Sequence, residues 1–374
     1  MNRLDRVRTR IEEAKLDALL ISGPVDDVFG RHSQNREWVS GFSGSTGRAV
    51  VTLDRAVMAV DFRYVEQAER ECVPRGFEVF KIDGREKQWL PKLVEAADLA
   101  GKTVGLSGAD ITFGGAEALK VAARSMRVGR PRFVVANGIV EGLRKVKDAE
   151  ELAALQRAID IGDAACDTAV AALRPGMTEI EVAELIEREV KGGGGEGLSF
   201  ETIVAAGPWG AMPHASPRNE AIRKGDAVVI DMGALSGGYC SDLTRTVTAG
   251  KPDANFQAIY DIVFEAQQAA IEGVEAGMSG VTAHRLASKV IGDAGYGENF
   301  GHGLGHGVGL EVHESPYLGE SSQDVLEEGM VFTIEPGIYL PGWGGVRIED
   351  VVVLENGKAR VLSHAKKMIP AGVS

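Results

Sequence analysis

Residues 226–249 read DAVVIDMGALSGGYCSDLTRTVTA, which predicts an apolar strand, a Ser-Gly-Gly turn and a second strand. If Ser236 and Gly237 form a two-residue loop, Asp231 lies directly opposite Asp242. The Cβ atoms of directly opposed residues are roughly 4.5–5.5 Å apart, and like charges at that separation destabilise the pairing. The apolar neighbours predict burial, where an unpaired carboxylate is costly. A bound cation would remove that cost; two acids on a solvated hairpin face are the alternative.

A second stretch, residues 331–354, repeats this arrangement with the sequence VFTIEPGIYLPGWGGVRIEDVVVL. It predicts a strand, a Gly/Pro-rich turn and a strand, and a loop centred on Gly342 places Glu335 opposite Glu349. Two hairpins that each present an opposed pair of acids fit poorly with chance. Four carboxylates that converge on one place indicate more than one divalent ion.

Four of the seven histidines lie near these hairpins in the sequence. His302, His306 and His313 fall within FGHGLGHGVGLEVHE (300–314), and His214 falls within GPWGAMPHASP (207–217). A lone histidine is more often structural than a ligand, but this grouping beside paired acids favours a functional site. Imidazole together with carboxylates suits manganese, cobalt, zinc or iron, whereas an all-oxygen site suits magnesium or calcium.

The composition is that of an ordinary soluble protein, long enough at 374 residues for two domains. A net charge of −13 without a basic stretch argues against nucleic acid or an anionic membrane surface as partner. No segment reaches the ~20 apolar residues of a membrane span. The three cysteines lack zinc-ligand spacing, which is consistent with a reducing cytoplasm. The glycine-rich stretch 41–47 lacks a phosphate-loop pattern and is interpreted as a structural loop.

Two domains are predicted, residues 1–136 and 137–374. In the first, helical patterns alternate with strand patterns, which indicates a small α/β domain. The helices are expected at 3–15, 63–71, 86–97 and 116–123, and the strands at 17–22, 49–53, 56–62, 77–82, 102–107 and 132–136. Residues 137–147 form the expected linker, and Asp148 is the N-cap of a long helix, with Glu151 at the capping-box position.

The second domain contains an internal repeat. Residues 175–190 align with residues 276–290 at an offset of 101, with Thr178 and Ser279 as corresponding N-caps. Each copy predicts a long helix, a Gly-Met turn, a capped helix, a glycine-rich connection and an acid-bearing hairpin. The repeat therefore predicts two related α/β halves whose acid pairs point into a shared cleft.

These segments resemble the "pita-bread" metallopeptidases, which include aminopeptidase P, prolidase and methionine aminopeptidase. The likeness covers nearly the whole chain and lies in VVIDMGALSGGYCSDLTRT, GHGLGHGVGLEVHE, MVFTIEPGIYL and GWGGVRIED. It implies a creatinase/prolidase-like N-terminal domain and a pita-bread catalytic domain. It also implies two divalent metal ions per chain, with manganese expected and cobalt or zinc as other options. The implied metal ligands are Asp231, Asp242, His306, Glu335 and Glu349, of which Asp242 and Glu349 bridge the two ions.

The remaining site residues also have expected roles, which come from the resemblance for the histidines and from residue chemistry for Glu335 and Arg347. Glu335 is the expected general base for water, and His214, His302 and His313 match non-ligand histidines that handle substrate and protons. Arg347 is expected to hold a carboxylate or to orient the site; a salt bridge to a buried acid is the alternative.

Proline-containing peptides are the expected substrates. Residues 1–136 have no general counterpart in methionine aminopeptidases, and GVRIED is similar to the proline-directed branch. GFSGSTGRAVVT and AVDFRYVEQA resemble aminopeptidase P more than prolidase. We therefore expect a cytoplasmic, homodimeric Xaa-Pro aminopeptidase, with an Xaa-Pro dipeptidase as the alternative. A non-catalytic or creatinase-like protein of this fold is a more remote alternative, because such proteins have lost metal-binding carboxylates and all five ligand positions are filled here.

Overall fold

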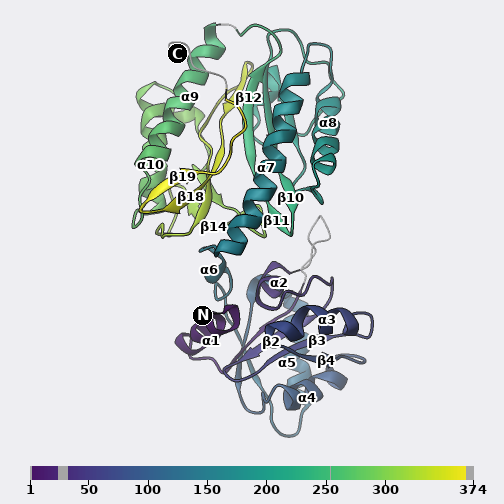
Figure 1. Cartoon of the computed structure of the whole chain (residues 1–374). Coiled ribbons are helices and arrows are strands. Elements are labelled where there is room, and N and C mark those ends of the chain that lie inside the picture. The colour runs from purple at the N-terminus through teal and green to yellow at the C-terminus, as the bar shows by residue number, and fades with distance from the viewer. Residues whose placement is uncertain (1, 24–32, 253, 368–374) are drawn as a thin grey trace. The chain divides into compact units, whose positions relative to one another are not determined.

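The computed structural model describes residues 2–23, 33–252 and 254–367. The chain divides into two compact units, Met1–Arg144 and Lys145–Ser374 (Figure 1). None of the helices in these described ranges is long and apolar enough to span a membrane.

The first unit has the alternating helices and strands that its sequence predicts. Its helices are α1 (Arg3–Glu13), α2 (Gln34–Ser40), α3 (Val65–Cys72), α4 (Glu86–Ala96), α5 (Phe113–Ser125) and α6 (Glu141–Arg144), with short 3-10 turns η1 (Val73–Arg75) and η2 (Gly108–Asp110). Its strands are β1 (Ala18–Ile21), β2 (Arg48–Thr52), β3 (Ala56–Val60), β4 (Glu78–Lys81), β5 (Thr103–Leu106) and β6 (Arg132–Val135). They form one mixed sheet in the order β4-β3-β2-β1-β5-β6.

Helix α2 was not predicted, and its burial explains why. Its sequence is polar, yet Arg36 is fully buried and donates hydrogen bonds to the carbonyl oxygens of Gly44 and Gly47 (3.0 Å to Gly47). Ser33 caps the helix at its start and Gly41 ends it in the left-handed conformation (φ 72°). The arginine thereby holds the glycine-rich stretch as part of the packing of this unit, in the structural role expected for it.

The second unit contains the two predicted repeats and both hairpins. Its helices are α7 (Ala149–Ala172), α8 (Glu179–Gly192), α9 (Ala254–Gly273) and α10 (Gly280–Asp293), with 3-10 turns η3 (Gly207–Ala211) and η4 (Gly297–Asn299). Its strands are β7 (Gly197–Leu198), β8 (Ile203–Ala206), β9 (Ala227–Met232), β10 (Ala234–Ser236), β11 (Tyr239–Cys240), β12 (Leu243–Thr248), β13 (Gly305–Gly307), β14 (Glu314–Leu318), β15 (Val331–Ile334), β16 (Gly337–Leu340), β17 (Gly344–Arg347), β18 (Asp350–Glu355) and β19 (Lys358–Val361).

The helix pairs α7/α8 and α9/α10 lie on either side of the strands in Figure 1. Thr178 and Ser279 cap α8 and α10 through their side chains, as the repeat predicts. One hydrophobic core joins α7 and α8 to β8, β9 and β12, and a second joins α9 and α10 to β14–β18. The unit is therefore built of two halves, each with a helix pair against its own strands.

The first hairpin has a different register from the one predicted. Gly237 (φ 59°) and Gly238 (φ 78°) both adopt the left-handed conformation and form the loop, so Ser236 pairs with Tyr239. A two-residue turn with two positive φ angles favours two glycines over the predicted Ser-Gly loop. Asp231 consequently pairs with Thr244 instead of Asp242.

The second hairpin has the predicted register. Gly337 pairs with Arg347 and Ile334 pairs with Asp350, so the same alignment places Glu335 opposite Glu349. Its loop contains Gly342 in the left-handed conformation (φ 82°).

Candidate metal centre

Strand ends bring five acid and histidine side chains together within the second unit. Asp231 lies near the end of β9, and Asp242 lies between β11 and β12. Glu335 follows β15, Glu349 precedes β18, and His306 is the middle residue of β13. The predicted register of the first hairpin was wrong, because Asp231 pairs with Thr244, two residues after the predicted partner Asp242. A shift of two residues keeps the side chains on the same face, so Asp231 and Asp242 are diagonal neighbours.

Three groups of side chains can each bring three potential ligand atoms within 4.8 Å of one another. Among the described residues these groups are Asp231, Asp242 and Glu349; His306, Glu335 and Glu349; and Asp242, His306 and His313. Shared members join the groups into one cluster, which contains all five residues that the resemblance suggests as ligands. It also contains His313, which the sequence analysis placed outside the ligand set.

Asp242 and Glu349 are buried acids in an unfavourable electrostatic environment. They are 5% and 2% exposed. Burial, followed by the negative charge of Glu349, raises the pKa of Asp242 well above its ordinary value. Burial and the charges of Glu335 and Asp231 raise the pKa of Glu349 in the same way. The two carboxyl groups therefore resist ionisation in the metal-free protein, and a cation between them would remove that resistance.

Arg347 forms the salt bridge to a buried acid that was the alternative interpretation of this residue. Its Nη2 lies 2.6 Å from Asp231 Oδ2, its Nη1 donates to the Tyr339 hydroxyl (2.7 Å), and its Nε donates to the Thr244 hydroxyl (3.0 Å). The other oxygen, Asp231 Oδ1, is buried and has no hydrogen-bond partner among the described residues. The arginine thus holds one Asp231 oxygen, and the remaining oxygen is available to a ligand.

His306 and Glu335 form a close pair at the other side of the cluster. His306 Nε2 lies 3.3 Å from Glu335 Oε1 and 3.6 Å from Asp242 Oδ2. Although burial opposes ionisation of Glu335, its hydrogen bond with His306 and the nearby positive charges lower its pKa to about 2. Glu335 is therefore an ionised acceptor at neutral pH.

The donor set fits a divalent transition metal. It combines one imidazole with four carboxylates, a mixture that suits manganese, cobalt, zinc or iron. The orphaned Asp231 oxygen and the raised pKa values of Asp242 and Glu349 are the observations expected of ligands without their cation.

The other predicted histidines lie around this cluster at different depths. His302 Nε2 lies 2.9 Å from the Tyr339 hydroxyl, and the residue borders a cavity of about 670 Å³. His313 is exposed at the rim, with its ring centroid 4.2 Å from that of His306. Desolvation of the imidazole, followed by the positive charge of His306, lowers the pKa of His313 to about 4. His214 is exposed on the loop after η3, and its charge contributes to the lowered pKa values of His302 and His313.

Sequence reasoning missed three hydroxyl groups that hold the cluster. The Thr244 hydroxyl donates to Glu349 Oε2 (2.7 Å), the Thr333 hydroxyl lies 3.3 Å from Glu335 Oε1, and the Tyr339 hydroxyl joins His302 to Arg347. Strand alternation gave a usable signal for Thr244, because it lies two residues after Asp242 and shares its face.

The comparisons with known proteins agree with this geometry. Residues 153–356 match Metallopeptidase family M24, and residues 3–146 match the Creatinase/Prolidase N-terminal domain. The chain belongs to metallopeptidase family M24. It is therefore a hydrolase of the peptidase class with the pita-bread fold, and divalent metal ions are expected for members of this family.

Full-length relatives of this M24 peptidase carry proline-specific names. A Pyrococcus furiosus protein named Xaa-Pro dipeptidase is 33% identical over 98% of this chain and 99% of its own length. The structure of an Xaa-Pro dipeptidase from Bacillus anthracis has a TM-score of 0.89, with 36% identity and 98% coverage of both chains. That of an X-Pro aminopeptidase from Thermotoga maritima has a TM-score of 0.86, with 35% identity and 99% coverage of both chains.

Proposed function

We propose that this M24 peptidase is an Xaa-Pro dipeptidase that hydrolyses the bond between an N-terminal residue and a C-terminal proline. The observation that carries the proposal is the convergence of both acid-bearing hairpins and His306 on one cluster. Full-length similarity to proteins named Xaa-Pro dipeptidase supports this substrate class. The comparisons therefore favour an Xaa-Pro dipeptidase, the alternative expected from the sequence, over an Xaa-Pro aminopeptidase, the main expectation. An Xaa-Pro aminopeptidase remains the second candidate, because the Thermotoga maritima structure matches over the same length.

The proposed ligands of two divalent ions are the five residues that the resemblance suggests. The resemblance implies that Asp242 and Glu349 would serve both ions, and the two carboxylates lie in one group with Asp231. Manganese is the proposed metal, with cobalt or zinc as alternatives. When bound, such ions supply a Lewis acid for the peptide carbonyl and make water nucleophilic at neutral pH.

The protein side chains have separate proposed roles in hydrolysis. Glu335, in contact with His306, would accept a proton from the attacking water. His313, at the rim, stabilises the developing oxyanion or the leaving nitrogen, and His214 and His302 contact the substrate. Arg347 fixes one oxygen of Asp231 and so orients that ligand.

The remaining expectations are also proposals. We propose that residues 1–136 form the N-terminal domain, that residues 137–374 form the catalytic domain, and that the protein is a cytoplasmic homodimer. Neither nucleic acid nor a membrane is proposed as a partner.

The choice of dipeptide over longer peptide is testable with Ala-Pro and Ala-Pro-Ala. We expect kcat/KM for Ala-Pro to exceed that for Ala-Pro-Ala by about tenfold or more. The proline carboxylate of a dipeptide can accept a hydrogen bond from a charged group, worth roughly 1.5–3 kcal/mol, and the tripeptide lacks it. Release of alanine from both substrates is the measurement, and Ala-Ala is the control for proline dependence. Equal or faster cleavage of Ala-Pro-Ala would assign the enzyme to the aminopeptidases.

Metal dependence gives a second test. Reconstitution of chelated protein with manganese is expected to approach two ions per chain by elemental analysis and to restore activity. A ligand that binds only the folded state raises stability by about 2.7 kcal/mol at 100 times its Kd, so metal should also raise the melting temperature. Full activity after exhaustive chelation contradicts the dinuclear centre.

A further inference from the structure

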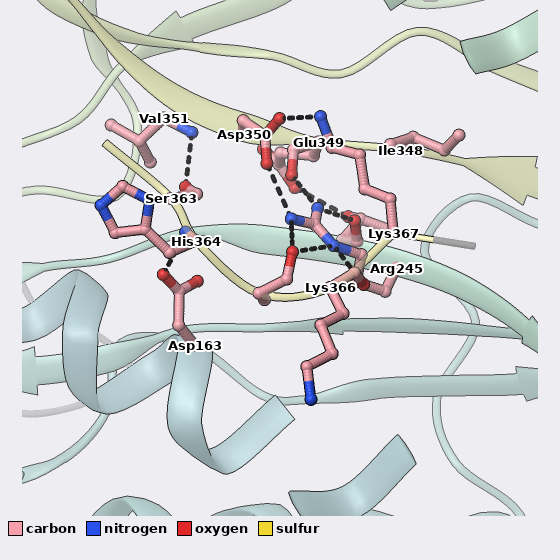
Figure 2. A network of polar contacts seen from close by, with 12 residues as sticks. Asp163, Arg245, Ile348, Glu349, Asp350, Val351, Ser363, His364, Lys366 and Lys367 are labelled. Atoms are coloured by element: carbon pink, nitrogen blue, oxygen red, sulfur yellow. Dashed lines mark hydrogen bonds and ion pairs between the residues drawn. The ribbon is translucent and has the colours of Figure 1, made fainter. Parts of the chain in front are cut away.

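Arg245 lies directly behind the proposed metal centre and is 2% exposed. It follows Thr244 in β12, and because consecutive strand residues point to opposite faces, it extends away from the Glu349 carboxylate that Thr244 contacts. Figure 2 shows its guanidinium beside Glu349 and Asp350. Nη1 donates to the Glu349 carbonyl oxygen (2.6 Å), and Nη2 donates to Asp350 Oδ1 (2.8 Å).

Residues Thr244 and Arg245 therefore contact the backbone N–H, the carbonyl oxygen and one carboxylate oxygen of Glu349. The Glu349 N–H donates to the Thr244 carbonyl oxygen (3.1 Å), and the Thr244 hydroxyl donates to Glu349 Oε2 (2.7 Å). Arg245 holds the remaining carbonyl oxygen and the next carboxylate. Asp242 lies only two residues before Thr244 on the same chain segment, so these contacts fix Glu349 relative to Asp242.

The Arg245–Asp350 ion pair also contacts two other segments of the chain, residues 365–367 and helix α9. Arg245 also donates to the carbonyl oxygens of Ala365 (2.7 Å) and Lys366 (3.2 Å), and Lys367 contacts the second Asp350 oxygen (Figure 2). Gln267 of α9 donates to that same Asp350 oxygen (3.2 Å). A planar guanidinium can satisfy several acceptors at fixed angles, whereas the point charge of a lysine cannot.

Stability alone is a weak explanation for this buried ion pair. Taking two charges out of water costs several kcal/mol per ion, and well-packed apolar residues often replace such a pair without loss of stability. The contacts instead converge on the backbone and neighbour of one proposed ligand. Groups that hold metal ligands in place typically contribute roughly 10–100-fold to metal affinity or activity.

We propose that Arg245 and Asp350 are positioning residues of the metal centre, which hold Glu349 at the distance from Asp242 that a pair of divalent ions requires. This inference rests on the proposed function of the cluster as a metal centre. Neither Arg245 nor Asp350 belongs to the three ligand groups, so on this proposal they act through Glu349.

Manganese binding by the chelated full-length protein tests the proposal through R245K and D350N. R245K keeps the positive charge but loses the planar guanidinium that donates to several acceptors at once. D350N removes only the negative charge. Calorimetric titration is expected to show manganese affinity weakened by roughly 10–100-fold in each variant. Activity of the variants is expected to recover in large part at saturating manganese, with KM near the wild-type value. D350N makes the smaller change and decides the outcome if R245K does not fold.

R218K is the matched control. Arg218 forms a similar fork with Glu179 (2.7 and 3.0 Å) in the same unit and contacts no ligand of the cluster, so R218K should bind manganese like the wild type. Urea unfolding of the metal-free proteins separates the two explanations. Wild-type manganese affinity in folded R245K or D350N, with only lower stability, overturns the positioning role. Absence of manganese binding by the wild type instead overturns the metal centre itself.

Discussion

Replacement of Asp242 with asparagine is expected to remove metal binding and peptidase activity together, while making the metal-free protein more stable. In the proposed ligand set Asp242 serves both ions; it is grouped with Asp231 and Glu349, and its Oδ2 lies 3.6 Å from His306 Nε2. The fall in activity should exceed the roughly 10–100-fold effect of groups that only support a ligand. Because the buried Asp242 carboxyl group resists ionisation, a neutral amide of the same shape removes an electrostatic cost from the metal-free fold.

The pH dependence of the metal-free protein gives the sign of this stability effect. The pKa of Asp242 is raised in the folded protein, so ionisation destabilises the fold as pH rises from its ordinary value of 3.8 toward the raised one. Glu335 does not mask this trend, because its pKa of about 2 lies below its ordinary 4.5 and its stabilising contribution is complete above that value. We expect the stability advantage of D242N over wild type to grow from pH 5 to pH 8.

Urea unfolding after chelation, manganese titration and Ala-Pro hydrolysis are the three measurements for D242N. E349Q is expected to behave in the same way, because Glu349 is buried beside the same charges. D160N, on the exposed side of α7, is the control and should resemble the wild type. Wild-type metal content in D242N, together with preserved activity, would remove Asp242 from the proposed ligand set.

The two acid-bearing hairpins could be predicted from the sequence because strand alternation is a local property. The register of the first hairpin was wrong by two positions, but an even shift leaves Asp231 and Asp242 on the same face. The loop of the second hairpin was longer, yet its register was correct, and the paired glutamates followed from it. Glycine conformation decided the first case: Gly237 and Gly238 both accept positive φ, which Ser236 does not favour.

Features that depend on distant contacts could not be predicted in this way. Helix α2 buries polar side chains, so it has no apolar period, although Ser33 and Gly41 at its ends were usable signals. The partnership of Arg245 with Asp350 joins residues 105 positions apart, and no local pattern pairs them. Substrate preference also lay beyond the sequence motifs, because the N-terminal segments resembled aminopeptidase P while the full-length comparisons favour a dipeptidase.

Replacement of His313 with alanine is expected to lower kcat by roughly 10²–10³-fold, the range for loss of one donor that stabilises a developing oxyanion. Its exposed position at the rim leaves it accessible to substrate, and its ring lies beside His306 at a centroid distance of 4.2 Å. A pKa of about 4 makes His313 a neutral imidazole at neutral pH in the metal-free protein, so its ring N–H can donate a hydrogen bond to the developing oxyanion. The five proposed ligands remain in this variant, so we expect metal content to stay near the wild-type value.

Steady-state kinetics with Ala-Pro and elemental analysis of the same H313A sample separate catalysis from metal binding. A fall in kcat with little change in KM is the result expected of a group that acts mainly in the transition state. H364A is the matched control, because His364 is exposed and its contact with Asp163 is made by its backbone N–H, which the substitution keeps. His313 forms a possible ligand group with Asp242 and His306, so the opposite outcome is that His313 binds a metal ion. If H313A loses an ion while H364A keeps its full content, His313 is a ligand and its proposed role as a non-ligand that stabilises the transition state is wrong.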